Sequence, residues 1–183
     1  LGYIKSQEKC SNYETFYNSN NMIWDNFSRW SKMLYSNKIK YLFERSGITY
    51  ITIANYLNIS KGRFSRYINE KEIMPLKYLN DLCNYFNVSL DYVFEFNKEQ
   101  NYKKYKKGIN KIEVGKRLKE FRKENKLTQE KLANILNTVH PVITNYEKGK
   151  FLIATPFLYT ICKKYNISAD YLLGKINNPK YLT

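Results

Sequence analysis

An internal repeat constrains the fold of this 183-residue chain more than any other feature of its sequence. Residues 40–93 align with residues 119–172 at a constant offset of 79 positions, without a gap, and 14 of the 54 pairs are identical. A gap-free match through a whole domain predicts that one fold has been duplicated. The identical pairs are Lys40/Lys119, Thr49/Thr128, Ala54/Ala133, Asn55/Asn134, Leu57/Leu136, Asn58/Asn137, Tyr67/Tyr146, Lys71/Lys150, Leu79/Leu158, Cys83/Cys162, Asn87/Asn166, Ser89/Ser168, Asp91/Asp170 and Tyr92/Tyr171.

Each copy is predicted to form five helices, because apolar residues recur at helical spacing between residues that start helices. A Ser or Thr caps a helix by accepting a bond from a free amide of the first turn, and Pro suits the first position because it has no N–H to lose. In the second copy, Thr128, Pro141, Thr155-Pro156 and Ser168 mark such starts, and Asn137 suits a left-handed turn. The core positions predicted there are Val114, Leu118, Phe121, Leu132, Ala133, Leu136, Leu158, Ile161, Cys162, Tyr165, Tyr171 and Leu172.

The first copy repeats this plan, with Thr49, Ser60 and Ser89 as the caps of helices two, three and five. Cys83 and Cys162 take the same place on helix four, where we expect a buried free cysteine to act as a small apolar residue. Three scattered cysteines and a single histidine, His140, supply too few ligands for a zinc site and fit reduced thiols in a cytosol. The core positions predicted in this copy are Ile39, Leu42, Phe43, Leu79, Leu82, Cys83 and Phe86.

The charge of the chain points to a polyanionic partner. Its 31 basic residues against 16 acidic ones give a formal net charge of +15, which favours nucleic acid or an anionic membrane surface. A basic surface that serves only solubility is the alternative. No apolar run approaches the roughly 20 residues that span a bilayer, and no signal peptide opens the chain, so a cytoplasmic location without a membrane is expected.

Helices two and three of each copy carry the pattern of a helix-turn-helix. This motif needs a small residue where the helices touch, a turn former between them and an apolar anchor in the second helix, which enters the major groove. Ala133, Asn137 and Ile143 meet these needs in the second copy. Their counterparts in the first copy are Ala54, Asn58 and Phe64.

The second copy resembles the Cro/phage-repressor (XRE) family. The resemblance lies in Leu127-Thr128-Gln129-Glu130-Lys131-Leu132-Ala133, in Ile143-Thr144-Asn145-Tyr146-Glu147-Lys148-Gly149-Lys150, and in the closing Ile167-Ser168-Ala169-Asp170-Tyr171-Leu172-Leu173-Gly174. It is strong over residues 112–175 and diverged over residues 37–94. It implies an all-α chain of two tandem five-helix lambda-repressor-like DNA-binding domains, joined by a basic linker and often dimeric.

The resemblance also implies which residues meet DNA. In the second copy, Gln129 would bond a phosphate, and Asn145 could bond adenine through two hydrogen bonds. Arg66 of the first copy matches Asn145 and could read a guanine. The full predicted set is Lys61, Arg63, Ser65 and Arg66 in the first copy, and Gln129, His140, Pro141, Thr144, Asn145, Lys148 and Lys150 in the second. The first copy departs from the family pattern at Tyr50 and Glu70, which take the places that Gln129 and Gly149 have in the second copy. The second copy departs at Val139, where a cap Ser is usual, and at Pro141, which fills a contact position.

Outside the repeat the sequence predicts an N-terminal extension over 1–36, a basic linker over 97–111 with a net charge of +5, and a C-terminal tail over 176–183. The two domains are then residues 37–96 and 112–175. Residues 22–35 could form an amphipathic helix that packs on the first domain or makes a dimer contact.

These features predict a sequence-specific DNA-binding transcriptional regulator, a repressor that places two recognition helices in successive or nearby major grooves, where one turn of DNA is ~34 Å. The alternative, a protein-binding or dimerisation module in residues 1–96 with DNA bound only by the second domain, stays open, as does a homodimer. An enzyme is not expected, because no phosphate-binding glycine loop, metal set or nucleophile–base pair is present. No cofactor and no metal are expected.

Overall fold

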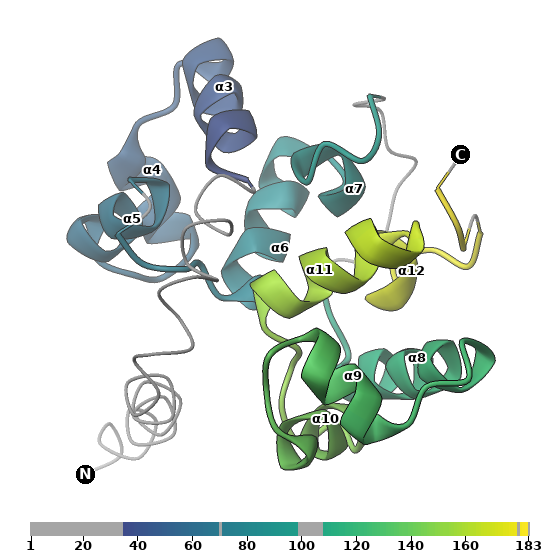
Figure 1. The fold of residues 1–183 in the computed structure, drawn as a ribbon. Coiled ribbons are helices and arrows are strands. Elements are labelled where there is room, and N and C mark those ends of the chain that lie inside the picture. The colour runs from purple at the N-terminus through teal and green to yellow at the C-terminus, as the bar shows by residue number, and fades with distance from the viewer. Residues whose placement is uncertain (1–34, 70, 99–107, 179, 183) are drawn as a thin grey trace, which may run out of the picture. The chain divides into compact units, whose positions relative to one another are not determined.

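The structure is a computed structural model that describes residues 35–69, 71–98, 108–178 and 180–182 (Figure 1). All of these residues fall within one compact unit, residues 32–183. They form helices and one isolated β-bridge, between Ile167 and Tyr181, so the all-α prediction is confirmed. The helices are α3 Ser36–Ser46, α4 Tyr50–Tyr56, α5 Lys61–Ile68, α6 Leu76–Phe86, α7 Leu90–Val93, α8 Lys111–Glu124, α9 Gln129–Ile135, α10 His140–Glu147, α11 Thr155–Tyr165 and α12 Ala169–Leu172.

The duplication is visible in the backbone as well as in the sequence. Helices α3–α7 make up the first copy and α8–α12 the second, which confirms the plan of five helices in each. Left-handed residues follow the helices at the same places in both copies, including the predicted turn residue Asn137. The equivalent pairs with positive φ are Gly47/Lys126, Asn58/Asn137, Asn87/Asn166 and Glu95/Gly174.

The predicted caps are also confirmed. Each cap side chain accepts a hydrogen bond from the backbone N–H three residues further on, and the caps are Thr49, Ser60, Ser89, Thr128 and Ser168. The start of α10 differs from the prediction, because the helix begins at His140 and Pro141 is its second residue. Neither of the first two amides of a helix has an internal partner, so Pro is tolerated at both positions. Val139 makes no side-chain cap there.

Most of the predicted core residues are buried, Cys83 and Cys162 among them. Burial raises the pKa of both thiols, which keeps them protonated. Three predicted core aromatics are only half-buried, and these are Phe86, Tyr165 and Tyr171. Arg117 lies over the Tyr171 ring, 4.7 Å from its centroid, so that ring is covered by a charged side chain at the rim of the core.

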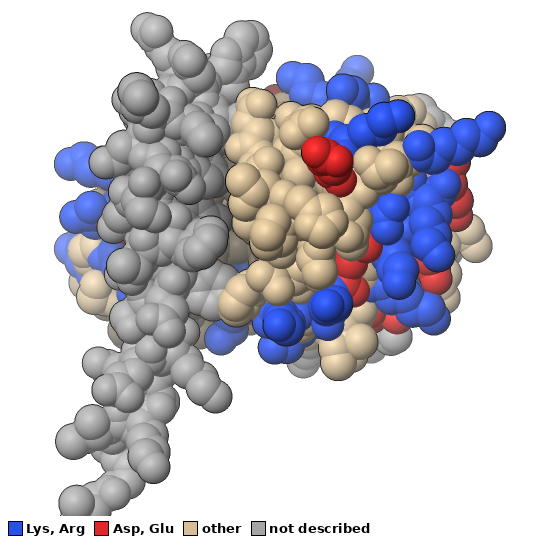
Figure 2. Space-filling view, turned by 60° about the horizontal axis from the view of Figure 1, so that its bottom comes forward, with Lys and Arg blue, Asp and Glu red and all other residues tan. Residues whose placement is uncertain are grey.

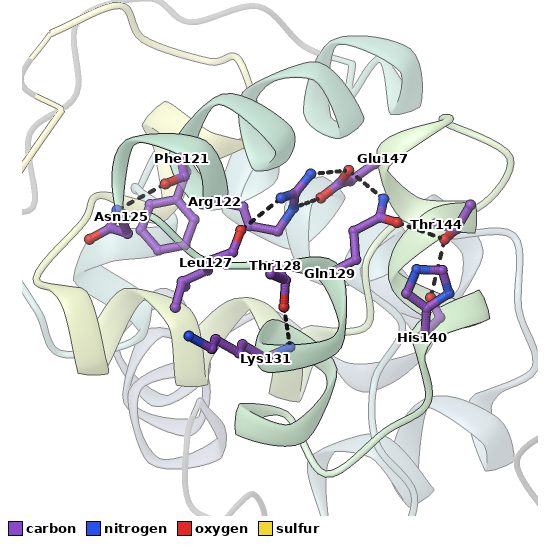
Figure 3. A network of polar contacts seen from close by, with 10 residues as sticks. All are labelled: Phe121, Arg122, Asn125, Leu127, Thr128, Gln129, Lys131, His140, Thr144 and Glu147. Carbon is purple, nitrogen blue, oxygen red and sulfur yellow. Dashed lines mark hydrogen bonds and ion pairs between the residues drawn. The ribbon is translucent and has the colours of Figure 1, made fainter.

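An ion pair joins α8 to the end of α10 (Figure 3). Arg122 donates through Nε to Oε1 of Glu147 at 2.5 Å and through Nη2 to Oε2 at 3.1 Å. The two side chains are only 11% and 3% exposed. The helices approach closely because Gly115 has no side chain, and a Cβ there would lie 2.4 Å from the carbonyl oxygen of Tyr146. This pair therefore fixes α10 against the first helix of its copy.

The two copies meet through their fifth helices, α7 and α12. The Asp91 carboxylate accepts a hydrogen bond from the backbone N–H of Ala169 at 2.7 Å, and the Asp170 carboxylate accepts one from the N–H of Asp91 at 2.9 Å. The Ser168 hydroxyl donates to Asp91 at 2.5 Å, and Lys175 Nζ lies 3.7 Å from Asp170. All five residues are buried, so their charged and polar groups must form with one another the hydrogen bonds and ion pairs that replace contacts with water.

Some predictions fall on residues that the structure does not describe. The N-terminal extension with its predicted helix at 22–35 lies outside the described residues, as does most of the linker. Within the described tail, Lys180 pairs with Glu124, and the N–H of Leu182 bonds the carbonyl of Asn166 at 2.8 Å. None of the described helices combines the length and the apolar character that crossing a bilayer requires.

Glu147→Ala is expected to lower the free energy of unfolding by about 3–5 kcal/mol, because it leaves the Arg122 charge buried without its partner. Urea unfolding of the full chain measures the loss. The control is Glu120→Ala, an exposed carboxylate on α8, which should change stability by less than about 0.5 kcal/mol. Equal effects of the two substitutions would contradict the structural role given to the ion pair.

The interface between the copies is expected to weaken as pH rises. Burial, and then the neighbouring Asp170 carboxylate, raise the pKa of Asp91 from 3.8 to about 7, although Ser168 and Ala169 donate to it. A group with a raised pKa in the folded state stabilises fully below its unfolded pKa and loses that contribution as pH approaches 7. Asp170 and Lys175 are the other charged groups at this place.

Asp91→Asn tests this, since the amide keeps the acceptor for Ala169 and cannot ionise. The difference in the free energy of unfolding, original chain minus variant, should decrease as pH rises from about 4 to about 7. Denaturant unfolding at several pH values measures this difference, with Glu120→Gln as the control that should leave the profile unchanged. A difference that is flat or rises with pH would show that Asp91 is not the titrating group.

Candidate nucleic-acid interface

Helices α9 and α10 of the second copy form a helix-turn-helix, and local sequence explains their geometry. Thr128 caps α9, Asn137 makes the left-handed turn with φ 49°, and α10 follows. Ala133 is 1% exposed where the helices touch, and Ile143 is fully buried and anchors α10 to the core. The predicted small residue, turn residue and anchor are therefore confirmed in their structural roles. With Ile143 turned inward, the opposite face of α10 is left to solvent.

The predicted contact residues of the second copy spread over that outer face and its borders. His140 and Pro141 lie exposed in the first turn of α10, and Thr144 and Asn145 are half-buried in the next turn. Lys148 and Lys150 follow the helix and are exposed, and Gln129 is half-buried at the start of α9. The structure thus gathers these residues on one helix-turn-helix, and their contacts with DNA stay a prediction.

A chain of hydrogen bonds connects three of these positions with the buried ion pair (Figure 3). Gln129 donates through Nε2 to Glu147 Oε2 at 2.7 Å, and its Oε1 accepts a bond from the Thr144 hydroxyl at 3.2 Å. That hydroxyl also lies 3.3 Å from the carbonyl oxygen of His140. The carboxylate of Glu147 therefore positions the Gln129 amide at the start of α9.

Sequence reasoning missed Arg122 and Glu147, which orient this network without lying on the exposed face. A signal for Glu147 was available. It follows the anchor Ile143 by four residues, so both lie on the same side of α10. An acidic residue on the core side of a helix needs a buried cation as its partner. The pairing itself could not be predicted from local sequence, because Arg122 lies 25 positions away from Glu147.

The first copy presents a similar helix-turn-helix on a different support. Lys61, Arg63 and Arg66 are exposed on α5, and Ser65 is half-buried. Arg66 pairs with Glu72, with Nη2 2.6 Å from Oε1, and their side chains are 59% and 36% exposed. Two exposed partners in water contribute little to stability, so this pair holds Arg66 only weakly.

Aromatic packing replaces the polar network in this copy. Tyr50 takes the place of Gln129 and contacts the rings of Phe43 and Phe64, with centroids 5.2 and 5.5 Å away. Ile68, which is fully buried, stands where the second copy has Glu147. The departure seen in the sequence at Tyr50 is therefore a change in how α4 and α5 are held together.

Basic side chains are plentiful around the second copy. Figure 2 shows Lys and Arg gathered at the edges of the face it presents, with Asp and Glu among them, around a broad and mostly uncharged area. Lys111, which the prediction did not include, lies exposed at the start of α8 and donates to the carbonyl of Lys150 at 3.2 Å. Across the described part of the chain, no three His, Cys, Asp or Glu residues come together as a metal site would require.

Comparison with known proteins agrees with this geometry. Residues 38–99 match the family described as the Cro/C1-type HTH DNA-binding domain, and residues 115–178 match a family described as a helix-turn-helix domain. The matches cover both copies of the repeat. No solved structure matches the chain.

Two curated proteins are similar over one domain's length. The HTH-type transcriptional regulator ImmR of Bacillus subtilis is 41% identical over 64 residues, which are 35% of this chain and 50% of the relative. The antitoxin PezA of Streptococcus pneumoniae is 34% identical over 68 residues, 36% of this chain and 43% of the relative. The chain thus spans half or less of the length of these relatives. With both copies matched, the chain carries two helix-turn-helix domains in tandem, and the first of them matches the Cro/C1-type family.

Proposed function

We propose that this protein is a sequence-specific transcriptional regulator, a repressor, that reads double-stranded DNA with the outer faces of α5 and α10. The observation that carries the proposal is that both helices occupy the same place in the repeat and leave a polar or basic face exposed. Their apolar anchors, Phe64 and Ile143, are fully buried. A regulator of this kind works where the DNA is, so the proposal includes a cytoplasmic location.

Direct reading of bases would fall to a few side chains. Asn145 has the amide that bonds the N6 and N7 atoms of adenine, and Arg66 has the guanidinium that bonds O6 and N7 of guanine. Gln129, Lys148 and Lys150 would bond phosphates and so set the register of the protein on the duplex. Lys61, Arg63, Ser65, His140, Pro141 and Thr144 complete the two faces.

The phosphate attraction would come mainly from the second copy and the linker. Residues 112–183 hold 13 basic and 6 acidic residues, a net of +7, and residues 37–96 hold 8 and 6, a net of +2. Because each phosphate contact releases a counterion, binding should weaken steeply with salt. Occupation of a promoter by such a protein would block polymerase, which is the basis for proposing repression.

A second candidate function assigns protein binding to the first copy. Ile51 and Tyr56 on α4 are 52% and 50% exposed, and Tyr41 on α3 is 45% exposed. Such side chains favour a contact with another protein, and one curated relative is named an antitoxin. On this reading only the second copy binds DNA. Sedimentation of the original chain and of the Ile51→Asp variant, each with and without a selected duplex, tests whether the exposed surface of α4 binds a protein partner or DNA.

Arg66→Ala and Asn145→Ala are each expected to lower affinity for the selected duplex by about 1–3 kcal/mol, because each removes a bidentate contact with one base. Each should also relax base preference, and at different positions of the site. Fluorescence anisotropy with the selected duplex and with single-base variants, at physiological salt, measures both effects.

The matched control is Lys148→Ala, which removes a phosphate contact. It should weaken binding to all sequences alike and reduce the salt slope by about one. If Arg66→Ala leaves affinity and base preference unchanged while Asn145→Ala alters them, only the second copy reads DNA, as the second candidate function requires. If neither substitution changes base preference, the proposal that α5 and α10 read sequence is wrong.

A further inference from the structure

The contacts between the copies are reciprocal. Asp91 in the first copy and Asp170 in the second are separated by the repeat offset of 79, and each carboxylate accepts a hydrogen bond from the backbone at the start of the other's helix. The helices that carry them, α7 and α12, are buried over nearly their whole length, Leu90 and Ala169 fully. Equivalent residues therefore meet each other at the centre of the interface.

The flanks of the interface repeat this exchange. The residue at the same place after each fifth helix, Phe96 in one copy and Lys175 in the other, contacts the fourth helix of the opposite copy. Lys175 Nζ lies 3.4 Å from Oδ1 of Asn84 on α6, and the Phe96 ring stacks on Tyr159 of α11 with centroids 5.2 Å apart. In each copy, the residue that follows the fifth helix thus contacts the fourth helix of the other copy.

Reciprocity of this kind determines the symmetry. When a patch meets its own equivalent, so that i contacts j and j contacts i, the two bodies are related by an approximate twofold rotation. A head-to-tail arrangement would instead bring each patch against a different one. The two copies are therefore arranged like the halves of a symmetric dimer, within one chain.

Building on the proposed function, we propose that a single chain recognises a DNA operator of two different half-sites in inverted orientation at one fixed spacing. A twofold between the copies turns α5 and α10 into inverted readers, and the duplex has local twofold axes that match them. The half-sites differ because the faces differ. Lys61, Arg63 and Arg66 stand where the other copy has His140, Val142 and Asn145.

The same contacts explain why a second chain is not required. The surfaces around α7 and α12 are buried against each other in one molecule, so they are filled before another copy could bind there. Lys175 lies beside Asp170, whereas its equivalent in the first copy is Phe96, so the two sides of the interface differ. This difference disfavours the pairing of identical copies from two chains. One chain on one duplex is the expected complex.

The test is to select bound sites from random DNA with the original chain and with a variant carrying about ten Gly/Ser residues inserted after Lys104. Both proteins should return two dissimilar half-sites, inverted, with one and the same spacing, because the interface and not the linker sets the geometry. Sedimentation with the selected duplex should give one chain per duplex. The same insertion after Thr183 is the control. Direct repeats, a spacing that broadens in the variant, or two chains per duplex would overturn the inference.

A measurement without DNA separates this inference from the proposed function. Spin labels on Asn55→Cys and Asn134→Cys, equivalent exposed positions of α4 and α9, are placed in a chain with Cys10→Ser. The original and insertion chains should give the same narrow distance distribution. A broad distribution in the insertion chain overturns the fixed twofold, whatever the DNA result. The same narrow distribution in both chains, with no enriched motif, overturns the proposed function and leaves the interface in place.

Discussion

Two buried aspartates, one from each copy of the repeat, hold this molecule together at the place where the copies meet. Asp91 and Asp170 would be costly to bury alone, and each is stabilised by a backbone N–H of the opposite helix. Because the bonds cross between the copies, the copies and their recognition helices become parts of one unit. The unfavourable free energy of burying a charge is seen at Asp91, where burial and the neighbouring Asp170 raise the carboxyl pKa to about 7.

The copies have diverged in how they support the same exposed face. The second uses a polar network in which Glu147 binds Arg122 and Gln129, and the first uses the aromatic packing of Tyr50 on Phe43 and Phe64. A hydrogen-bonded support fixes the direction of the Gln129 amide, whereas ring packing places no such constraint on the basic side chains of α5. The two faces therefore differ in chemistry on one backbone plan.

Much of the fold could be predicted from local signals. Caps such as Thr128 and left-handed residues such as Asn137 act within one turn of the chain, so the sequence near them is sufficient. The repeat offset supplied the domain plan. What could not be predicted are contacts between residues far apart in sequence, above all Arg122 with Glu147 and Asp91 with Asp170. The half-burial of Tyr171 was missed for the same reason, because Arg117 covers it from another helix.

Hydroxyl-radical footprinting of the full chain on a selected duplex tests the central claim most directly. If α5 and α10 both read DNA from one chain, protection should appear in two windows on the same face of the duplex, about one helical turn or ~34 Å apart. Asn145→Ala should then weaken one window and Arg66→Ala the other. A single protected window, unchanged by Arg66→Ala, would contradict the account.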